Sequence, residues 1–229
     1  MYSYSHFLMF HLAIIALFFP VSDSAMALTS AGSNENTKVS EKFKTQVSKD
    51  EIQLHVRLSK AADQGDVAAQ CELGLMYYNG EGVAKDYKKA FDLFAKAAKQ
   101  GSAKAQTLLG LMYYNGEHVA KDYKKAFDLL TKAVEQGSVG AQTLLGVMYA
   151  NGHGVGKGYE KAVELYSKAA YQEEEEAQFK LGTMYFLGLG VTQDSKKASQ
   201  WFKMAADQGH ELAKKAVQEM SKSGKLKAN

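Results

Sequence analysis

The chain has 229 residues, of which 46% are hydrophobic and 23% are charged, and its formal net charge is +3 at pH 7. Arg57 is the only arginine, and the lysines are spread among acidic residues, whereas nucleic-acid readers cluster arginine for bidentate contacts to phosphates and bases. This composition disfavours nucleic-acid binding, and the single cysteine, Cys71, excludes an intramolecular disulfide.

The first 27 residues have the pattern of a cleavable secretory signal. Residues 6–21 form an apolar run of roughly 15 residues, whereas a membrane span needs about 20. The small-x-small site Ala25-Met26-Ala27 follows, so we expect cleavage after Ala27 and no membrane span in the mature protein. We therefore expect a periplasmic or secreted bacterial protein. Because no Lys or Arg precedes the apolar run, an uncleaved anchor or a misassigned start are the alternatives.

Two further segments lie outside the expected folded domain. Residues 28–49 are polar with little periodic apolar content, which predicts a flexible leader. Residues 221–229 (SKSGKLKAN) predict a basic tail. Pro20, the only proline, lies within the signal, and the rest of the chain is rich in Ala, Lys, Leu and Gln. This composition favours helix throughout the domain that we predict over residues 50–220.

A motif recurs every 36 residues within this domain. The segment Leu73–Leu93 (LGLMYYNGEGVAKDYKKAFDL) returns as Leu109–Leu129, with His118 in place of Gly82 as the only change. We predict a half-repeat over 53–64, full repeats over 65–100, 101–136, 137–172 and 173–208, and a capping helix over 209–220. Self-similarity at this length is typical of a solenoid, in which each repeat buries its apolar face against its neighbours.

Each full repeat predicts two helices, which we call helix A and helix B. In the first repeat, residues 66–78 place apolar side chains on one stripe of an amphipathic helix A. An Asn-Gly-Glu-Gly turn ends helix A, Asp86 is the expected N-cap of helix B, and Gly101 closes helix B in the left-handed conformation. Gly74 and its equivalents are expected to let helices approach closely. The stripe of helix A consists of Ala69, Leu73, Met76 and Tyr77.

The pattern L-G-x-M-Y-x-x-G-x-G-V…D-x-x-K-A…K-A-A-x-Q-G resembles the Sel1-like repeat, a relative of the tetratricopeptide repeat, and covers roughly residues 53–220. The resemblance implies an all-α fold, a right-handed α-α superhelical solenoid of helix-turn-helix repeats. It also implies a protein-binding scaffold without catalysis or a cofactor. Some secreted relatives are rich in disulfides, and this chain, with Cys71 alone, departs from them.

Three departures from the repeat have physical consequences. His118 replaces a turn glycine, so this turn must change conformation or accept strain of about 1 kcal/mol or more. Gly158 replaces the capping Asp of the other repeats, which weakens a helix start by a few tenths of a kcal/mol. The acidic run Glu173–Glu176 opens the fourth repeat, either as a solvated N-terminal cap or as a docking patch for a basic partner.

No catalytic or metal constellation is evident, and we do not expect an enzyme. The stretch GHGVGKG (residues 152–158) lacks the first glycine and the final Ser/Thr of a phosphate-binding loop and follows a helix, so it predicts an ordinary turn. A zinc site needs three or four converging ligands, and no His, Cys or carboxylate set has that spacing. Adventitious chelation by His118 with His153 is the alternative. Cys71 has no base beside it in the sequence.

By analogy with related helical repeats, the helices A line the concave side of the solenoid, and we expect a partner protein to bind there. Aromatic rings beside polar groups suit protein interfaces. The alternative is that the rings pack against adjacent repeats. The candidate residues are Leu75, Tyr78, Asn79, Leu111, Tyr114, Asn115, Val147, Asn151, Thr183 and Phe186.

Three functional classes follow. The first is a monomeric, non-catalytic scaffold that binds an envelope, effector or host protein. The second is an immunity protein that neutralises a toxic effector in the periplasm. Some secreted members of the family resemble such proteins. The third is a weak β-lactam-binding hydrolase, suggested by certain disulfide-rich relatives.

Overall fold

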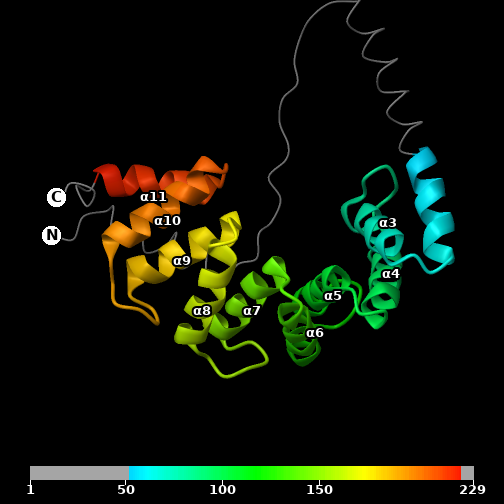
Figure 1. The fold of residues 1–229 in the computed structure, drawn as a ribbon, viewed down its shortest axis with the longest axis horizontal. Helices are drawn as coiled ribbons and strands as arrows, with labels where there is room; N and C mark the ends of the chain where they lie inside the picture. The colour runs from blue at the N-terminus through cyan, green and yellow to red at the C-terminus, as the bar shows by residue number, and fades with distance from the viewer. Residues whose placement is uncertain (1–51, 223–229) are drawn as a thin grey trace, which may run out of the picture. The chain divides into compact units, whose positions relative to one another are not determined.

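The computed structural model describes residues 52–222, and every regular element within that range is an α-helix (Figure 1). These residues fall into two compact parts, 52–120 and 121–222, and each part is described by itself. The predicted signal peptide (1–27), the leader (28–49) and residues 223–229 of the basic tail lie outside the described range.

The N-terminal part contains the half-repeat, one full repeat and the next helix A. Residues 52–63 are helical, and they are followed by α3 (Val67–Asn79), α4 (Tyr87–Lys99) and α5 (Ala103–Asn115). α3 packs on α4, and α4 packs on α5. The carboxylate of Asp66 accepts a hydrogen bond from the Ala69 N–H at 2.7 Å, and Gly80 ends α3 at φ 79°. The predicted helix A of 66–78 is therefore confirmed to within one residue.

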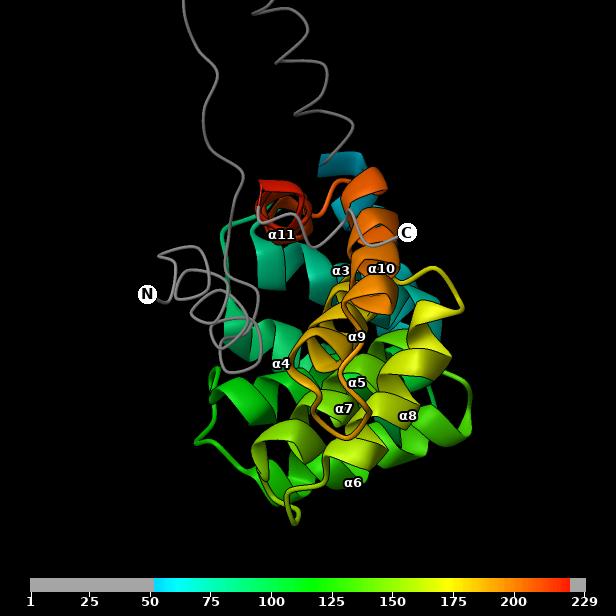
Figure 2. The ribbon, with the colours of Figure 1, turned by 90° about the vertical axis from the view of Figure 1, so that its left-hand side faces the viewer.

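The C-terminal part holds six helices in chain order. They are α6 (Tyr123–Glu135), α7 (Val139–Asn151), α8 (Tyr159–Ala170), α9 (Glu175–Leu187), α10 (Ser195–Asp207) and α11 (Glu211–Lys222). Each helix packs on the next one along the chain. Figure 2 shows α11, the predicted capping helix, beside α10. Across residues 52–222, none of the helices has the length and apolar character that crossing a bilayer requires.

Close contact between helices A and B depends on glycine, as expected. A Cβ atom on Gly74 of α3 would lie 2.4 Å from Cε1 of Phe94 on α4, which is well inside van der Waals contact. A Cβ atom on Gly146 would lie 2.6 Å from the ring of Tyr166, and one on Gly182 would lie 2.8 Å from the ring of Phe202. The ring of helix B thus fills the space that a side chain on helix A would need.

A buried glutamine of helix A is bonded both to the preceding helix and to the end of its own helix B. Gln70 is buried in α3, donates its Nε2 to the Ala62 carbonyl at 3.1 Å, and accepts from Gln100 Nε2 at 2.9 Å. Gln178 of α9 repeats both bonds, to the Ala170 carbonyl and from Gln208. Because a buried amide costs free energy unless it is hydrogen-bonded, these pairs satisfy the repeated Gln at little cost.

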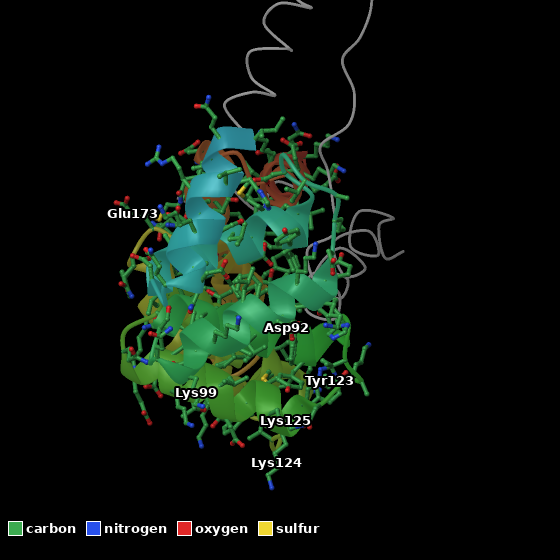
Figure 3. The ribbon with its side chains drawn as sticks, turned by 90° about the vertical axis from the view of Figure 1, so that its right-hand side faces the viewer. Asp92, Lys99, Tyr123, Lys124, Lys125 and Glu173 are labelled. Carbon is green, nitrogen blue, oxygen red and sulfur yellow. The ribbon has the colours of Figure 1, made fainter. Side chains whose placement is uncertain are left out.

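The solvent side of helix B carries charges. Lys88 forms an i, i+4 ion pair with Asp92 at 3.2 Å, and both side chains are more than half exposed. Lys124, at the start of α6, is exposed and points away from the ribbon in Figure 3. Exposed pairs of this kind contribute little to stability and mainly keep the face solvated.

The two strained or weakened turns are found where the sequence predicts them. His118 adopts φ 64°, close to the 68° of Gly82 in the preceding repeat, so it keeps the glycine conformation and accepts the strain. Gly158 provides no side-chain hydrogen bond to α8, whereas Asp86, Asp122 and Asp194 each cap their helix. The predicted fold class, an all-α solenoid of helix-turn-helix repeats, is confirmed.

Candidate protein-binding surface

One position of helix A keeps an apolar side chain partly open in three successive repeats. Leu75, Leu111 and Val147 are all half-buried, although the opposite stripe of the same helices is in the core. Leu73, for example, is 5% exposed and Leu109 is 7% exposed. A half-open leucine or valine in each of these three repeats is available for contact with another protein.

The asparagines at the end of helix A differ in their partners. Asn79 is exposed and donates Nδ2 to Glu81 Oε1 at 2.8 Å, and Asn115 donates to Glu117 Oε1 at 3.2 Å. Asn151 has a histidine two residues later instead of a glutamate. Both Nδ2 and Oδ1 of Asn151 are buried and have no protein hydrogen-bond partner within the described range.

The tyrosines of the candidate surface pack within the protein. The ring of Tyr78 meets Tyr87 edge-to-face at 5.3 Å and lies 6.5 Å from Phe94, both on α4. Tyr78 remains half-buried, whereas Tyr114 is only 8% exposed. For Tyr114, packing is the better description of the two alternatives left open by the sequence.

At the fourth repeat the same face is closed. Thr183 is 1% exposed and donates its hydroxyl to the Phe179 carbonyl at 2.9 Å. Phe186 is buried in one apolar cluster with Phe179, Phe202 and three residues of α11. The residues from α11 are Ala213, Ala216 and Met220. The capping helix thus contributes to the core that takes up Phe186, and neither Thr183 nor Phe186 offers an open surface.

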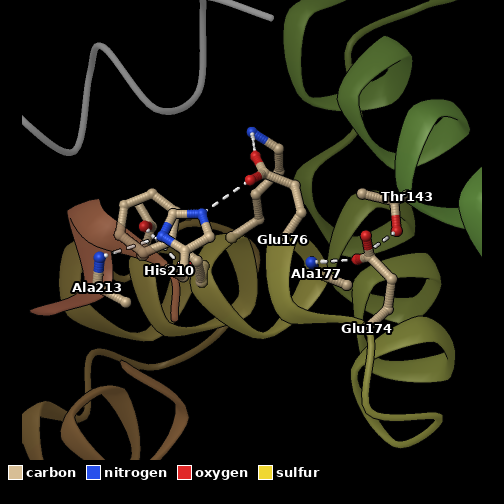
Figure 4. Close-up of polar contacts among 9 residues, drawn as sticks. Thr143, Glu174, Glu176, Ala177, His210 and Ala213 are labelled. Carbon is tan, nitrogen blue, oxygen red and sulfur yellow. Dashed lines mark hydrogen bonds and ion pairs between the residues drawn. The ribbon is translucent and has the colours of Figure 1, made fainter. Parts of the chain in front are cut away.

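The acidic run that opens the fourth repeat divides into two inward and two outward side chains. Figure 4 shows Glu174 and Glu176 turned towards other helices. Glu174 is the N-cap of α9: it accepts from the Ala177 N–H, and from the Thr143 hydroxyl of α7 at 3.1 Å. Burial raises the pKa of Glu174 despite these hydrogen bonds.

Glu176 is the centre of a buried charge cluster. Its Oε1 lies 2.8 Å from Nζ of Lys180, and its Oε2 lies 2.8 Å from Nε2 of His210. His210 Nδ1 accepts from the Ala213 N–H of α11, so the Nε2 proton is donated to Glu176 (Figure 4). Burial alone would raise the pKa of Glu176, but the hydrogen bond from His210 and the charge of Lys180 lower it to about 2.

Glu173 and Glu175 are exposed. Glu173 adopts φ 64° at the position of the helix-closing glycines, and its side chain points away from the helices in Figure 3. Only two of the four carboxylates are therefore free to meet a partner. This arrangement supports the cap interpretation of the run more than the docking patch.

Within residues 52–222, no three His, Cys, Asp or Glu side chains gather as a metal site requires. His118 packs against Phe91 at 5.6 Å, and His153 stacks on Tyr123 at 4.5 Å. Burial and the nearby Lys121 lower the pKa of His153. Cys71 is buried, with Sγ 3.5 Å from the hydroxyl of Ser102. The glycine-rich stretch 152–158 joins α7 to α8 as a turn, as predicted.

The geometry of repeated helix pairs agrees with a family model. The Sel1 repeat model matches four times, at residues 67–102, 103–138, 139–173 and 175–210. The chain belongs to the Sel1 repeat family. The matches begin about two residues after the predicted repeats, so the starting point of each repeat differs while the repeat length of 36 residues agrees. Sel1 repeats form scaffolds of a kind typical of protein binding.

Solved Sel1 structures are similar to this chain. A Sel1 repeat protein from Oxalobacter formigenes is 34% identical, with a TM-score of 0.72 over 78% of this chain and 71% of that protein. A protective antigen of uropathogenic Escherichia coli strains is 35% identical, with a TM-score of 0.64 over 74% of this chain. The alignment spans only 36% of that antigen. No curated protein sequence matches the chain.

An immunity protein from Pseudomonas aeruginosa is also similar. It is 25% identical, with a TM-score of 0.51, over 74% of this chain and 67% of the immunity protein. The Sel1 fold is therefore shared with a protein of that function.

Two groups of residues escaped the reasoning from sequence. One is the buried cluster of Glu176, Lys180 and His210, whose members stand where the third repeat has Gly140, Leu144 and Glu174. The other is an exposed apolar patch on helices B, formed by Tyr171, Trp201 and Met204. In both cases the sequence contained a signal, because these residues differ from those at the equivalent positions of the other repeats, 36 residues away.

Proposed function

We propose that this Sel1 repeat chain is a non-catalytic scaffold of the bacterial periplasm or secreted space that binds a partner protein along its helices A. The observation that carries the proposal is the half-open apolar residue at one position of both helices A in the N-terminal part, Leu75 and Leu111. Val147 holds the same position in the C-terminal part. Asn79 and Asn115 lie one turn further along and supply polar groups beside this apolar row. Apolar contacts with polar neighbours are typical of transient protein interfaces.

The proposed surface is smaller than the set suggested by the sequence. It retains the half-buried or exposed residues of the first three repeats and omits Tyr114, Thr183 and Phe186, because buried side chains offer no contact area. The retained residues are Leu75, Tyr78, Asn79, Leu111 and Asn115 in the N-terminal part and Val147 in the C-terminal part. Asn151 is omitted as well, because both Nδ2 and Oδ1 are buried. Their part in binding stays a prediction.

The test is site-specific photo-crosslinking in cells. A photoreactive phenylalanine at position 75 or 111 should capture a discrete partner, identified by mass spectrometry. The variant with Leu75→Glu and Leu111→Glu carries the photoreactive residue at another position. It should capture the partner at least tenfold less than the wild type, because two charges would enter an apolar contact. The matched control is Lys88→Glu with Lys124→Glu, exposed positions of helix B in the same two repeats.

The melting temperature of both double variants should stay within a few degrees of the wild-type value, because the altered side chains are at least partly exposed. Equal loss of capture in both variants would remove the proposed surface. The export part of the proposal is tested separately, by fractionation and by N-terminal sequencing of the exported chain, which should begin at Leu28.

An immunity function is the second candidate, and the similarity to the P. aeruginosa immunity protein favours it. If this chain neutralises a toxin, its gene should lie beside one for a secreted toxic protein. Co-expression of the exported chain should then restore the growth of cells that receive this toxin in the periplasm. If these cells survive without the chain, or if the chain does not restore their growth, the immunity function is excluded and the general scaffold function remains.

A further inference from the structure

An exposed apolar patch lies on the helices B of the third and fourth repeats. Tyr171, at the end of α8, is 76% exposed, and Met204 of α10 is 50% exposed. Trp201 meets Tyr171 edge-to-face, with ring centroids 5.3 Å apart. Trp201 and Met204 are three residues apart on α10 and therefore share one face of that helix. We call Tyr171, Trp201 and Met204 the aromatic patch.

The other repeats show that the fold does not require the aromatic patch. The position of Tyr171 holds Lys99, Glu135 and Asp207 in the other repeats, and the position of Met204 holds Lys96, Lys132 and Lys168. Leu93, Leu129 and Leu165 occupy the position of Trp201. Each of the first two positions thus holds a charged residue in three of the four repeats, and the first two repeats have charged residues at both. Exposing two large apolar side chains there favours aggregation unless something binds them.

The charges around the aromatic patch are not balanced. Lys196, Lys197 and Lys203 lie on α10, and all three are exposed. Lys197 approaches the capping Asp194 at 4.0 Å, whereas neither Lys196 nor Lys203 makes an ion pair within the described residues. Lys197 precedes Trp201 by one turn, and its Nζ lies over the ring of Tyr185, 5.3 Å from the centroid. Asp194 is the N-cap of α10, and Asp207, which is exposed and follows Met204 by one turn, is the one acidic residue within the helix.

The side of the patch formed by α8 differs. Glu164 is paired with Lys168 at 2.5 Å, so the two charges compensate each other. The exposed Glu173 follows Tyr171 by two residues and repels an acidic group there. Negative charge in a partner is therefore favoured over α10 and disfavoured near residue 173.

We propose that the aromatic patch is a second docking surface, which takes an acidic peptide segment carrying one large apolar side chain. The apolar side chain packs on Tyr171, Trp201 and Met204, and the carboxylates of the segment lie near Lys196, Lys197 and Lys203. Tyr and Trp rings give a large contact area at low entropic cost, and Met adapts to the shape of its partner. This surface lies on helices B, so it does not depend on the function proposed for helices A.

The test uses a random 12-residue peptide library displayed on phage and selected on the folded protein. The counter-selection uses the variant Tyr171→Glu, Trp201→Leu, Met204→Lys, which carries the residues found at these positions in other repeats. Because the chain already builds its helix pairs with those residues, the variant should keep its helicity and melting temperature. Peptides that bind the wild type alone should be acidic and contain Trp, Phe, Leu or Met.

A synthetic copy of the most enriched peptide then gives the quantitative result. Its Kd should rise at least ~10-fold for the variant with the patch reverted, as expected for loss of aromatic anchors. It should also rise ~10-fold for Lys196→Glu with Lys203→Glu, and weaken with added salt. The paired control is Lys88→Glu with Lys124→Glu, which should leave the Kd unchanged.

Three results would overturn the proposal. One is that the selection yields no peptide that distinguishes the wild type from the reverted variant. The second is that the distinguishing peptides are basic or uncharged. The third is that vesicles of phosphatidylglycerol bind the wild type but not the reverted variant while no peptide does, which would make the patch a membrane contact.

Discussion

At the scale of single residues, the carboxylate of Glu176 is held by two partners in a largely buried site. It is held by a lysine four residues later on α9 and by the histidine that caps α11. The charge of Lys180 and the hydrogen bond from His210 offset the cost of burying the carboxylate, and removing one member of the buried Glu176–Lys180 pair leaves the other uncompensated. The cluster therefore connects α9 to the start of α11 in a way that depends on pH.

Replacing Glu176 with Gln should lower the free energy of unfolding at pH 7 by about 3 kcal/mol. Folding lowers the pKa of Glu176 from 4.5 to about 2, so its stabilisation is complete above pH 4.5 and is lost as the pH falls towards 2. Urea unfolding of both proteins from pH 7 to pH 3 should show the difference shrinking below pH 4.5. The exposed neighbour is the control: Glu175→Gln should change stability by less than about 0.5 kcal/mol. A difference that is constant with pH would exclude the ionised carboxylate as its cause.

The turns offer a reciprocal pair of substitutions at positions 82 and 118. His118→Gly should stabilise the protein by about 1 kcal/mol, because glycine adopts a φ of 64° without strain. Gly82→His should destabilise it by a similar amount at the same place in the preceding repeat. Thermal unfolding measures both. If His118→Gly is destabilising, the contact of His118 with Phe91 outweighs the strain.

At the scale of elements, α7 contains one buried glycine and one exposed glycine, and replacing them with alanine should have opposite effects on stability. Gly146 faces the buried ring of Tyr166, and a Cβ atom there would lie 2.6 Å from Cε1. Gly146→Ala should therefore destabilise the protein by 1–3 kcal/mol through overpacking. Gly140, on the same helix but exposed, is the control, since Gly140→Ala should stabilise by up to about 1 kcal/mol through helix propensity. Chemical denaturation should give opposite signs, and equal effects would remove the packing argument.

The helices were predictable because each boundary is set by neighbours in sequence. Asp66 and Asp86 cap their helices with their own side chains, and Gly80 closes α3 at positive φ. Whether a residue of helix A is open or buried was not predictable in the same way. Tyr78 and Phe186 occupy equivalent positions, yet Phe186 is buried in a cluster that includes residues of α11, which lies later in the chain. Exposure depends on what packs next to a repeat, and a single repeat does not contain that information.

At the scale of the whole molecule, a repeat array must end its core without leaving apolar surface exposed. An inner repeat is covered by the next helix pair, but the last one has no successor. In this chain α11 takes that role, with Ala213, Ala216 and Met220 facing the last repeat. The predicted capping helix of 209–220 is thus close to the observed Glu211–Lys222. The sequence identified this end because its period stops there.

Deleting residues 210–229 tests the role of the capping helix. The deletion would uncover Phe179 and Phe202, which are 3% and 2% exposed in the intact chain. We expect the free energy of unfolding to fall by at least about 3 kcal/mol and the binding of the dye ANS to increase, because a large apolar face would meet water. The control removes only residues 223–229 and should match the full chain in both measurements.

A single substitution addresses the same role if the shortened chain does not fold. Met220 is 1% exposed, so Met220→Ala should cost 2–5 kcal/mol by leaving a cavity between α11 and the last repeat. The exposed Ser221→Ala beside it should cost less than about 0.5 kcal/mol. If Met220→Ala were as stable as the wild type and the shortened chain bound no more ANS, α11 would not be the cap. The last repeat would then have to be stable with its apolar face in water, contrary to the behaviour expected of stacked repeats.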